Sequence, residues 1–241
     1  MVYVIDTETT GLYGYPQDRV LEIGIVEYDE DTGKITPVYN ELINYPDIEE
    51  FDRNYVGLKG EKGIWIYRNS DLSIQDTLDA EKDLDTVVKE VRKLLKGKKI
   101  TAYNIGFDFD KFLYNTPWDL RPITVCEYDI MPIATKVVME MVRDDTVKDK
   151  TLRMRLIKES MESKYEEKWV KSIDAYNVLC PDDPMGLQHR QTHRAIDDAV
   201  MEAHILDRMV NWDFVLNMLH YYHNSGERKL CLPIRSPSIR I

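Results

Sequence analysis

Long apolar runs are missing from this sequence of 241 residues, and cysteine is scarce. The longest apolar stretches are only a few residues long, whereas a membrane-spanning helix needs about 18 or more, so no membrane segment is expected. Three cysteines, Cys126, Cys180 and Cys231, make an odd number without the spacing of a metal site, which is typical of a reduced, cytoplasmic protein. A basic leader is missing too, because Met1 is followed at once by a short β-like run, and we expect no secretory signal.

The sequence also has no excess of positive charge. Lys and Arg number 32 against 43 Asp and Glu, which gives a formal net charge of −11. This balance argues against a protein that holds nucleic acid by bulk charge. It does not argue against an enzyme that holds phosphates through divalent cations, because such an enzyme needs clustered carboxylates. With 43% hydrophobic and 31% charged residues, the composition is that of a globular protein that can fold without disulfides.

Hydrophobic spacing divides the chain into short strands followed by helices. The clearest helix carries Leu84, Val87, Val88, Val91 and Leu95 on one stripe. We expect strands at residues 2–5, 19–28, 35–43, 100–103 and 123–128, and helices at residues 79–96, 108–114, 129–143, 151–167, 168–179 and 192–221. Residues 44–80 are expected to form an elaborated loop with room for a short hairpin. This order predicts an α/β fold in which a mixed sheet, an antiparallel three-strand meander plus parallel strands, is flanked by helices.

Asp6 and Glu8 end the first predicted strand. Two residues apart in an extended chain, their side chains point to the same face. Neighbouring carboxylates repel each other unless a cation neutralises them, and hard cations prefer oxygen ligands, so the pair favours Mg²⁺ or Mn²⁺. The alternative is a solvated strand end, which is the commoner explanation for an isolated Asp-x-Glu.

Three further residues are candidates for the same site. Asp108 follows the predicted strand at 100–103, where capping of the next helix is the alternative role. Asp198 falls in the first turns of the last long helix, and His193 precedes that helix. A histidine beside a metal-bound carboxylate suits a general base near neutral pH, whereas an ordinary surface role is the alternative.

Taken together, the three segments resemble the motifs of a known enzyme family. Residues 4–12 (VIDTETTGL) resemble the first motif of the DEDDh, or DnaQ-like, proofreading exonucleases of the ribonuclease-H-like superfamily. Residues 103–108 resemble the second motif, and His193 with Asp198 resembles the third. The likeness implies a ribonuclease-H-like fold and hydrolysis of phosphodiesters from the 3′ end of single-stranded DNA to nucleoside monophosphates.

The resemblance also implies roles for individual residues. Asp6, Glu8 and Asp198 would hold one of two Mg²⁺ or Mn²⁺ ions, Asp6 and Asp108 the other, and His193 would deprotonate the attacking water. The terminal nucleotide would lie against the residues that follow the acid pair and two residues of the second motif, namely Thr9, Thr10, Gly11, Leu12, Asn104 and Phe107. For Phe107 packing beneath the site is the preferred role.

The chain departs from the family pattern at several places. Tyr103 stands where many relatives have histidine, and residues 145–170 look like a helical insertion within a domain spanning 1–225. Residues 148–171 carry a net charge of +3, which fits either a solvated helix face or a contact with substrate or partner. His189 has the wrong spacing to Asp198 to replace His193, and we assign it to phosphate contact or to the surface.

The basic C-terminal tail, residues 226–241, is left with three roles: packing on the domain, contact with nucleic acid, or binding of a partner such as a polymerase. Three other functions remain beside the DNA exonuclease. They are a 3′–5′ exonuclease or oligoribonuclease-like trimmer of RNA, a polymerase-associated module that binds partners, and a non-catalytic nucleic-acid-binding relative.

Overall fold

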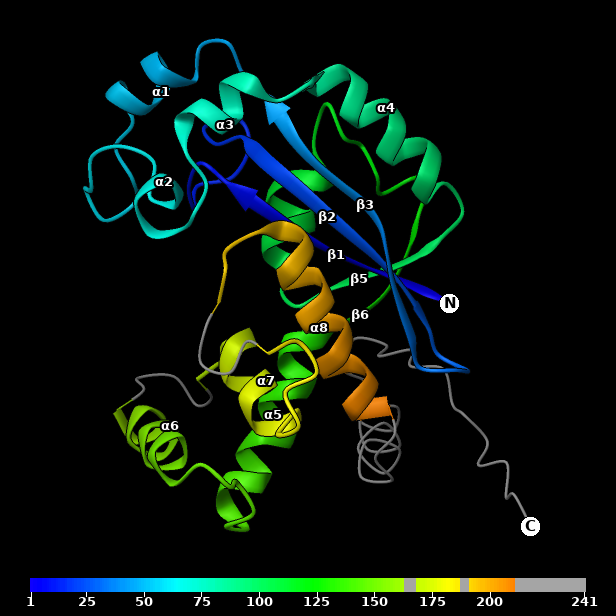
Figure 1. Ribbon diagram of the computed structural model, residues 1–241, viewed down its shortest axis with the longest axis vertical. Coiled ribbons are helices and arrows are strands. Elements are labelled where there is room, and N and C mark those ends of the chain that lie inside the picture. Colours follow the sequence, from blue (N-terminus) through cyan, green and yellow to red (C-terminus); the bar gives the residue numbers. More distant parts are fainter. Residues whose placement is uncertain (163–167, 187–190, 211–241) are drawn as a thin grey trace.

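The computed structural model describes residues 1–162, 168–186 and 191–210. Its centre is a six-stranded sheet with the strand order β4-β3-β2-β1-β5-β6 (Figure 1). The strands are β1 (Val2–Thr9), β2 (Val20–Asp29), β3 (Lys34–Asn44), β4 (Lys82–Asp83), β5 (Lys99–Ala102) and β6 (Val125–Asp129). The first three form an antiparallel meander, and β5 and β6 extend β1 in parallel. The predicted mixed α/β sheet of the ribonuclease-H-like type is therefore confirmed.

Helices cover both faces of the sheet, and each face has its own hydrophobic core. One core lies under α1 (Ile48–Asn54), α2 (Ile66–Asn69), α4 (Leu84–Leu95) and the wide, π-type helix η1 (Gly106–Leu113), with α3 (Ile74–Asp79) beside it. The other lies under α5 (Ile130–Arg143), α6 (Lys150–Glu162), α7 (Ser172–Leu179) and α8 (Ala195–Val210). The alternation of side chains along β1 explains the two cores, since Tyr3 and Ile5 enter the first and Val2 and Val4 the second.

The region 44–80 differs from the predicted loop. It contains three short helices, α1, α2 and α3, of which only the last has a full capping box, between Ser73 and Asp76. An isolated antiparallel bridge between Val56 and Lys62 matches the short hairpin for which the loop had room. These helices are four to seven residues long, too short to show a helical repeat in the sequence, and they depend on packing against the sheet.

Several helix boundaries also differ from prediction, each for a local reason. Helix α4 begins at Leu84 rather than at 79, because Asp83 caps it by accepting a hydrogen bond from the Thr86 amide at 2.8 Å. Helix α7 begins at Ser172 rather than at 168. Val170 bonds elsewhere, its amide to the Thr135 hydroxyl at 3.0 Å and its carbonyl to the Tyr103 hydroxyl at 2.8 Å.

The segment 145–170 contains α6, which lies beyond α5 and α7 from the sheet (Figure 1). Several of its cations bind nearby acids: Arg155 pairs with the buried Asp174, and Lys168 pairs with Glu159. These ion pairs favour a solvated helix face over a surface that attracts nucleic acid. Several predictions fall outside the described residues. They are the helix ends expected at residues 167 and 221, the role of His189, and the basic tail.

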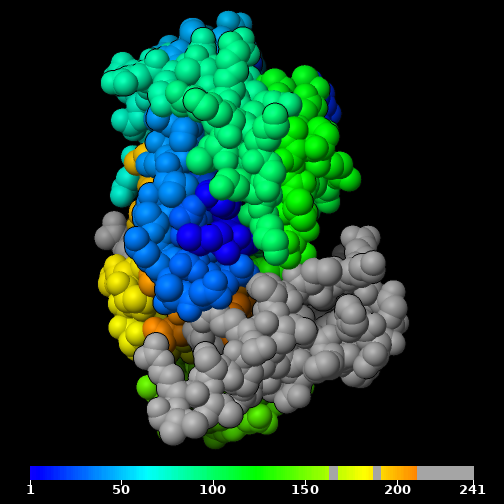
Figure 2. All heavy atoms as spheres, turned by 90° about the vertical axis from the view of Figure 1, so that its right-hand side faces the viewer, coloured from blue at the N-terminus to red at the C-terminus, as the bar shows by residue number. Residues whose placement is uncertain are grey.

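The edge view in Figure 2 places the start of the chain, in dark blue, between the β2–β3 region and the segment that contains α4. The amino terminus pairs there with Glu30 at 3.0 Å. In the part of the chain that the structure describes, no helix is both long and apolar enough to cross a membrane.

Candidate active site

The site begins at the end of β1, where Asp6 and Glu8 lie on the same side of the strand. Asp6 pairs in register with Gly24 of β2, and Glu8 pairs with Glu22. Both acidic side chains are partly buried under the start of α8. The predicted common face of this pair is therefore seen in the structure.

Asp108 reaches the same strand from η1. One oxygen of its buried carboxylate accepts a hydrogen bond from the Thr7 amide at 3.1 Å and another from the Thr7 hydroxyl at 2.7 Å. The alternative role as a helix cap is wrong, because the helix starts at Gly106 and Asp108 lies within its first turn. Ile105 takes the N-cap position instead, without a side-chain capping bond. Asn104, one residue earlier, accepts a hydrogen bond from the Phe107 amide at 3.2 Å through its side-chain oxygen.

The last two predicted residues come from the start of α8. Asp198 is buried, and its carboxylate accepts a hydrogen bond from the Gln191 side chain at 2.9 Å. His193 precedes the helix with a left-handed backbone, φ +54°. Its ring nitrogen and one oxygen each of Glu8 and Asp198 all lie within 4.8 Å of one another. Asp6 and Asp108 lie outside this closest group, but their charges act on its members.

A buried acid on β2 holds α8 in place. The Glu22 carboxylate accepts hydrogen bonds from the Arg194 guanidinium at 2.6 and 3.0 Å and from the Ala195 amide at 3.1 Å. A Cβ at Gly24 would collide with the backbone of Ala195 and Ile196, so only glycine lets the helix approach β2 this closely. This contact brings the helix start against the end of β1.

A fifth carboxylate lies beneath the site. Glu202, one turn after Asp198 on α8, is 3% exposed and accepts a hydrogen bond from the Tyr103 amide at 3.1 Å. The Tyr103 side chain does not enter the site, because its hydroxyl donates to the Val170 carbonyl. Tyr103 therefore does not replace the histidine that many relatives carry at this position, whereas its amide anchors an additional acid.

Crowding of these acids changes their ionisation. Burial raises the pKa of both Asp108 and Asp198 to about 7, although hydrogen bonds from Thr7 and Gln191 oppose the shifts. Burial first, and then repulsion from Glu202, Asp108, Asp198 and Glu8, raises the pKa of Asp6 well above its ordinary value. Burial lowers the pKa of His193, which favours the neutral imidazole.

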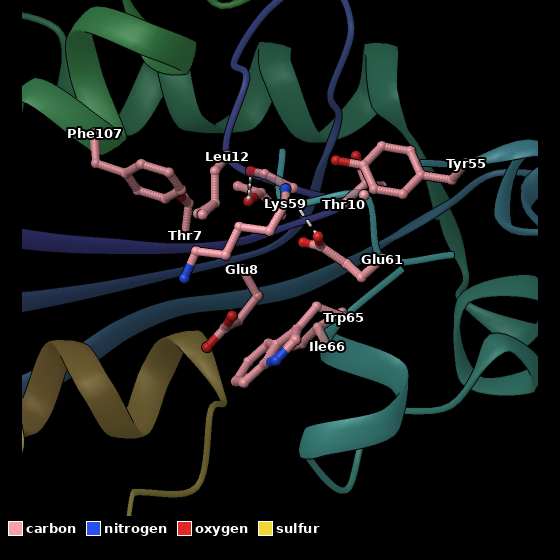
Figure 3. A pocket seen from close by; sticks show the side chains of 13 residues that line it. Thr7, Glu8, Thr10, Leu12, Tyr55, Lys59, Glu61, Trp65, Ile66 and Phe107 are labelled. Atoms are coloured by element: carbon pink, nitrogen blue, oxygen red, sulfur yellow. Dashed lines mark hydrogen bonds between the residues drawn. The ribbon is translucent and has the colours of Figure 1, made fainter. Parts of the chain in front are cut away.

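A cavity of about 800 Å³ opens beside Glu8 (Figure 3). Its walls come from the end of β1 and the residues after it, from the loop between α1 and α2, and from η1; they include Thr9, Thr10, Gly11, Leu12, Lys59, Trp65 and Phe107. Five of the six residues expected at the terminal nucleotide therefore line this space, and Asn104 does not. Phe107 is partly exposed in the cavity wall. It also packs against the core, with its ring centroid 5.4 Å from that of Phe112, which agrees with the preferred packing role.

Comparison with known protein families assigns the chain to one of them. A model of the RNase_T family, described as exonuclease, matches residues 3–206. The chain belongs to this exonuclease family. The match covers most of the sequence and confirms the resemblance to proofreading exonucleases. No curated protein sequence matches the chain.

Solved structures of nucleases resemble this exonuclease weakly. Cell-death related nuclease 4 aligns over 87% of this chain and 63% of its own, with 17% identity and a TM-score of 0.48. A full-length 3′-exonuclease aligns over 87% and 60%, with 17% identity and a TM-score of 0.45. The nuclease domain of a DEDDh 3′-exonuclease bound to rAMP aligns over 87% and 90%, with 15% identity and a TM-score of 0.44. This chain thus spans less than two thirds of the first two.

The acid cluster of this exonuclease suits a divalent cation. Carboxylate oxygens are the ligands that Mg²⁺ and Mn²⁺ prefer. Glu8 and Asp198 present theirs beside the His193 ring. Burial first, and then repulsion from neighbouring carboxylates, raises the pKa of Asp6, and a bound cation would relieve that repulsion.

Sequence reasoning did not single out Glu22, Glu202, Lys59 or Trp65 as site residues. A signal was present for Glu202, because four residues after Asp198 is the next position on the same helix face. Glu22 lay within a recognised strand, but its pairing with Glu8 depends on the strand register. Lys59 and Trp65 come from the region predicted as a loop, so nothing in their spacing placed them near the acids.

Proposed function

We propose that the protein is a metal-dependent 3′–5′ exonuclease that shortens single-stranded DNA and releases nucleoside monophosphates. The observation that carries this proposal is the meeting of Glu8, His193 and Asp198 within 4.8 Å of one another. Asp6 and Asp108 act on this group through their charges, and Glu8 lines the cavity. The four acids come from β1, η1 and α8, and His193 precedes α8. The like charges of the acids oppose one another unless a cation is bound. Family membership independently supports phosphodiester hydrolysis.

In this mechanism Asp6, Glu8 and Asp198 would hold one of two Mg²⁺ or Mn²⁺ ions, and Asp6 with Asp108 would hold the other. Such ions neutralise charge on the reacting phosphate and lower the pKa of the attacking water. His193, kept neutral by its partial burial, accepts the proton of that water. Thr9, Thr10, Gly11, Leu12 and Phe107 line the space that receives the terminal nucleotide.

The shape of the cavity favours a flexible strand end over a duplex. Its lining combines the apolar side chains of Leu12, Phe107 and Trp65 with the carboxylate of Glu8 (Figure 3). An unpaired base can enter such a space and lie against apolar side chains, whereas a paired base cannot. DNA is the substrate that we propose, and RNA is the competing one.

A strand-shortening assay tests the proposal. Single-stranded DNA and RNA oligonucleotides of the same sequence, labelled at the 5′ end, are incubated with the protein in Mg²⁺, in Mn²⁺ or in EDTA. We expect a ladder that shortens from the 3′ end, requires metal and is absent for Asp6→Ala. The DNA-to-RNA rate ratio decides the substrate, and no cleavage of either would refute the proposal.

A further inference from the structure

Trp65 stands at the side of the cavity opposite Phe107 (Figure 3). It is 45% exposed although its neighbours Ile64 and Ile66 are 1% and 2% exposed. Its carbonyl accepts hydrogen bonds from the Arg68 amide at 3.1 Å and from the Asn69 side chain at 2.8 Å. The backbone at Trp65 is thus held firmly while the indole projects toward the acids.

The indole contacts the histidine of the site. The ring centroids of Trp65 and His193 lie 5.2 Å apart, with the ring planes at 90°. Such an edge-to-face contact stabilises one orientation of the two rings. Within residues 1–162, 168–186 and 191–210, the imidazole makes no hydrogen bond that would orient it.

The backbone of His193 makes this contact important. The left-handed φ of +54° is costly for a residue with a Cβ. Glu22 holds the following residues, Arg194 and Ala195, but it does not touch the imidazole. The aromatic contact with Trp65 restrains rotation about the His193 side-chain bonds.

We propose that Trp65 is a positioning residue, which holds the His193 imidazole beside Glu8 and Asp198. This inference rests on the proposed function, since it gives Trp65 a role through the general base. The indole keeps the ring nitrogen within the 4.8 Å group of ligand atoms. Loss of the indole lets the imidazole rotate away, which slows the chemical step and leaves binding of the strand end largely intact.

The test compares Trp65→Ala and Trp65→Phe with Trp169→Ala, which changes a tryptophan of similar exposure (49%) beside α6. We measure kcat and KM on single-stranded DNA, each variant in both the wild-type and the His193→Ala background. Trp65→Ala should lower kcat about tenfold, the upper range for an aromatic contact, with KM changed by less than about twofold. Trp65→Phe should retain most of the rate, and Trp169→Ala should have none of these effects.

The His193→Ala background separates positioning from base stacking. In that background Trp65→Ala should change kcat by less than about twofold, because the ring that it positions is gone. An equal loss in both backgrounds, or a loss confined to KM, would overturn the inference and assign Trp65 to substrate stacking. An inactive wild type would refute the proposed function itself, whereas an active wild type with unaffected Trp65→Ala would refute only the role of Trp65.

Discussion

Asp6 shares its end of β1 with four other carboxylates, each of which opposes its ionisation. Such a residue is poorly suited to stabilise the fold and well suited to hold a cation. The same holds for Asp198, whose pKa burial raises to about 7. Under the proposed function, we expect these acids to lower the stability of the metal-free protein and to serve as metal ligands when a cation binds.

Asp6→Asn should therefore separate activity from stability. Losing a ligand of the metal site removes several kcal/mol of transition-state stabilisation, so cleavage should fall by about 10³-fold or more. The melting temperature in EDTA should stay the same or rise, because one buried like charge is gone. The exposed Asp85 on α4 provides the control, since Asp85→Asn should change neither value. A marked fall in melting temperature for Asp6→Asn would contradict this account.

Two substitutions of Glu202 should have different effects on the stability of the metal-free protein. Glu202→Gln keeps an oxygen for the Tyr103 amide and removes a charge, so the metal-free protein should be at least as stable as the wild type. Glu202→Ala leaves the buried amide without an acceptor and should cost about 1–3 kcal/mol. Denaturant unfolding in EDTA measures both. Equal destabilisation by the two would show that the charge, rather than the hydrogen bond, is what Glu202 contributes.

At the scale of elements, α8 is positioned by contacts distant in sequence. Glu22 on β2 binds Arg194 and the Ala195 amide, 172 and 173 residues away. Glu22 is fully buried and the Arg194 side chain is 36% exposed. The pair therefore fixes one end of α8 and, next to it, His193.

Glu22→Ala should destabilise the protein by about 1–3 kcal/mol, since it removes a buried partner from a half-exposed cation and an amide. It should also lower the cleavage rate, because the neighbouring His193 loses its support. The control is the exposed pair at the other end of α8, where Arg208 binds Asp182. Asp182→Ala should cost less than about 1 kcal/mol. Equal losses of stability in the two variants, measured by denaturant unfolding, would refute a special role for Glu22.

Elements with a strong local pattern were predictable from the sequence. The apolar stripe of α4 predicts a helix, and the β-branched runs of β1 to β3 predict strands. The candidate site residues lie in segments that resemble known motifs. The short helices α1, α2 and α3 were not predictable, because their stability comes from tertiary packing. The contact of Trp65 with His193 joins positions 128 residues apart, which spacing along the chain cannot reveal.

For the whole molecule, the crowded acids predict an unusual dependence of stability on pH. Asp108 and Asp198 have pKa values of about 7 in the folded state, against about 3.9 in an unfolded chain. Between these values the folded state binds more protons than the unfolded state. Stability of the metal-free protein should therefore fall as pH rises from about 5 to 8.

Melting temperatures in EDTA at pH 5 and pH 8 measure this effect. Millimolar Mg²⁺ or Mn²⁺ should recover stability at pH 8, because a cation that binds only the folded site stabilises it. Asp198→Asn should weaken both the fall with pH and the recovery by metal. A melting temperature that is independent of metal at pH 8 would contradict the assignment of the acids to a cation site.

The hydrogen bonds from Thr7 to Asp108 have a mechanical consequence. Asp6 and Glu8 are part of β1, and Thr7 ties Asp108 to the same strand, so these three acids move as one rigid body. Asp198 lies in the first turn of α8, and His193 precedes that helix. A cation held between Glu8 and Asp198 would therefore cross-link the end of β1 to the start of α8. It would act beside the bonds by which Glu22 ties the same helix end to β2.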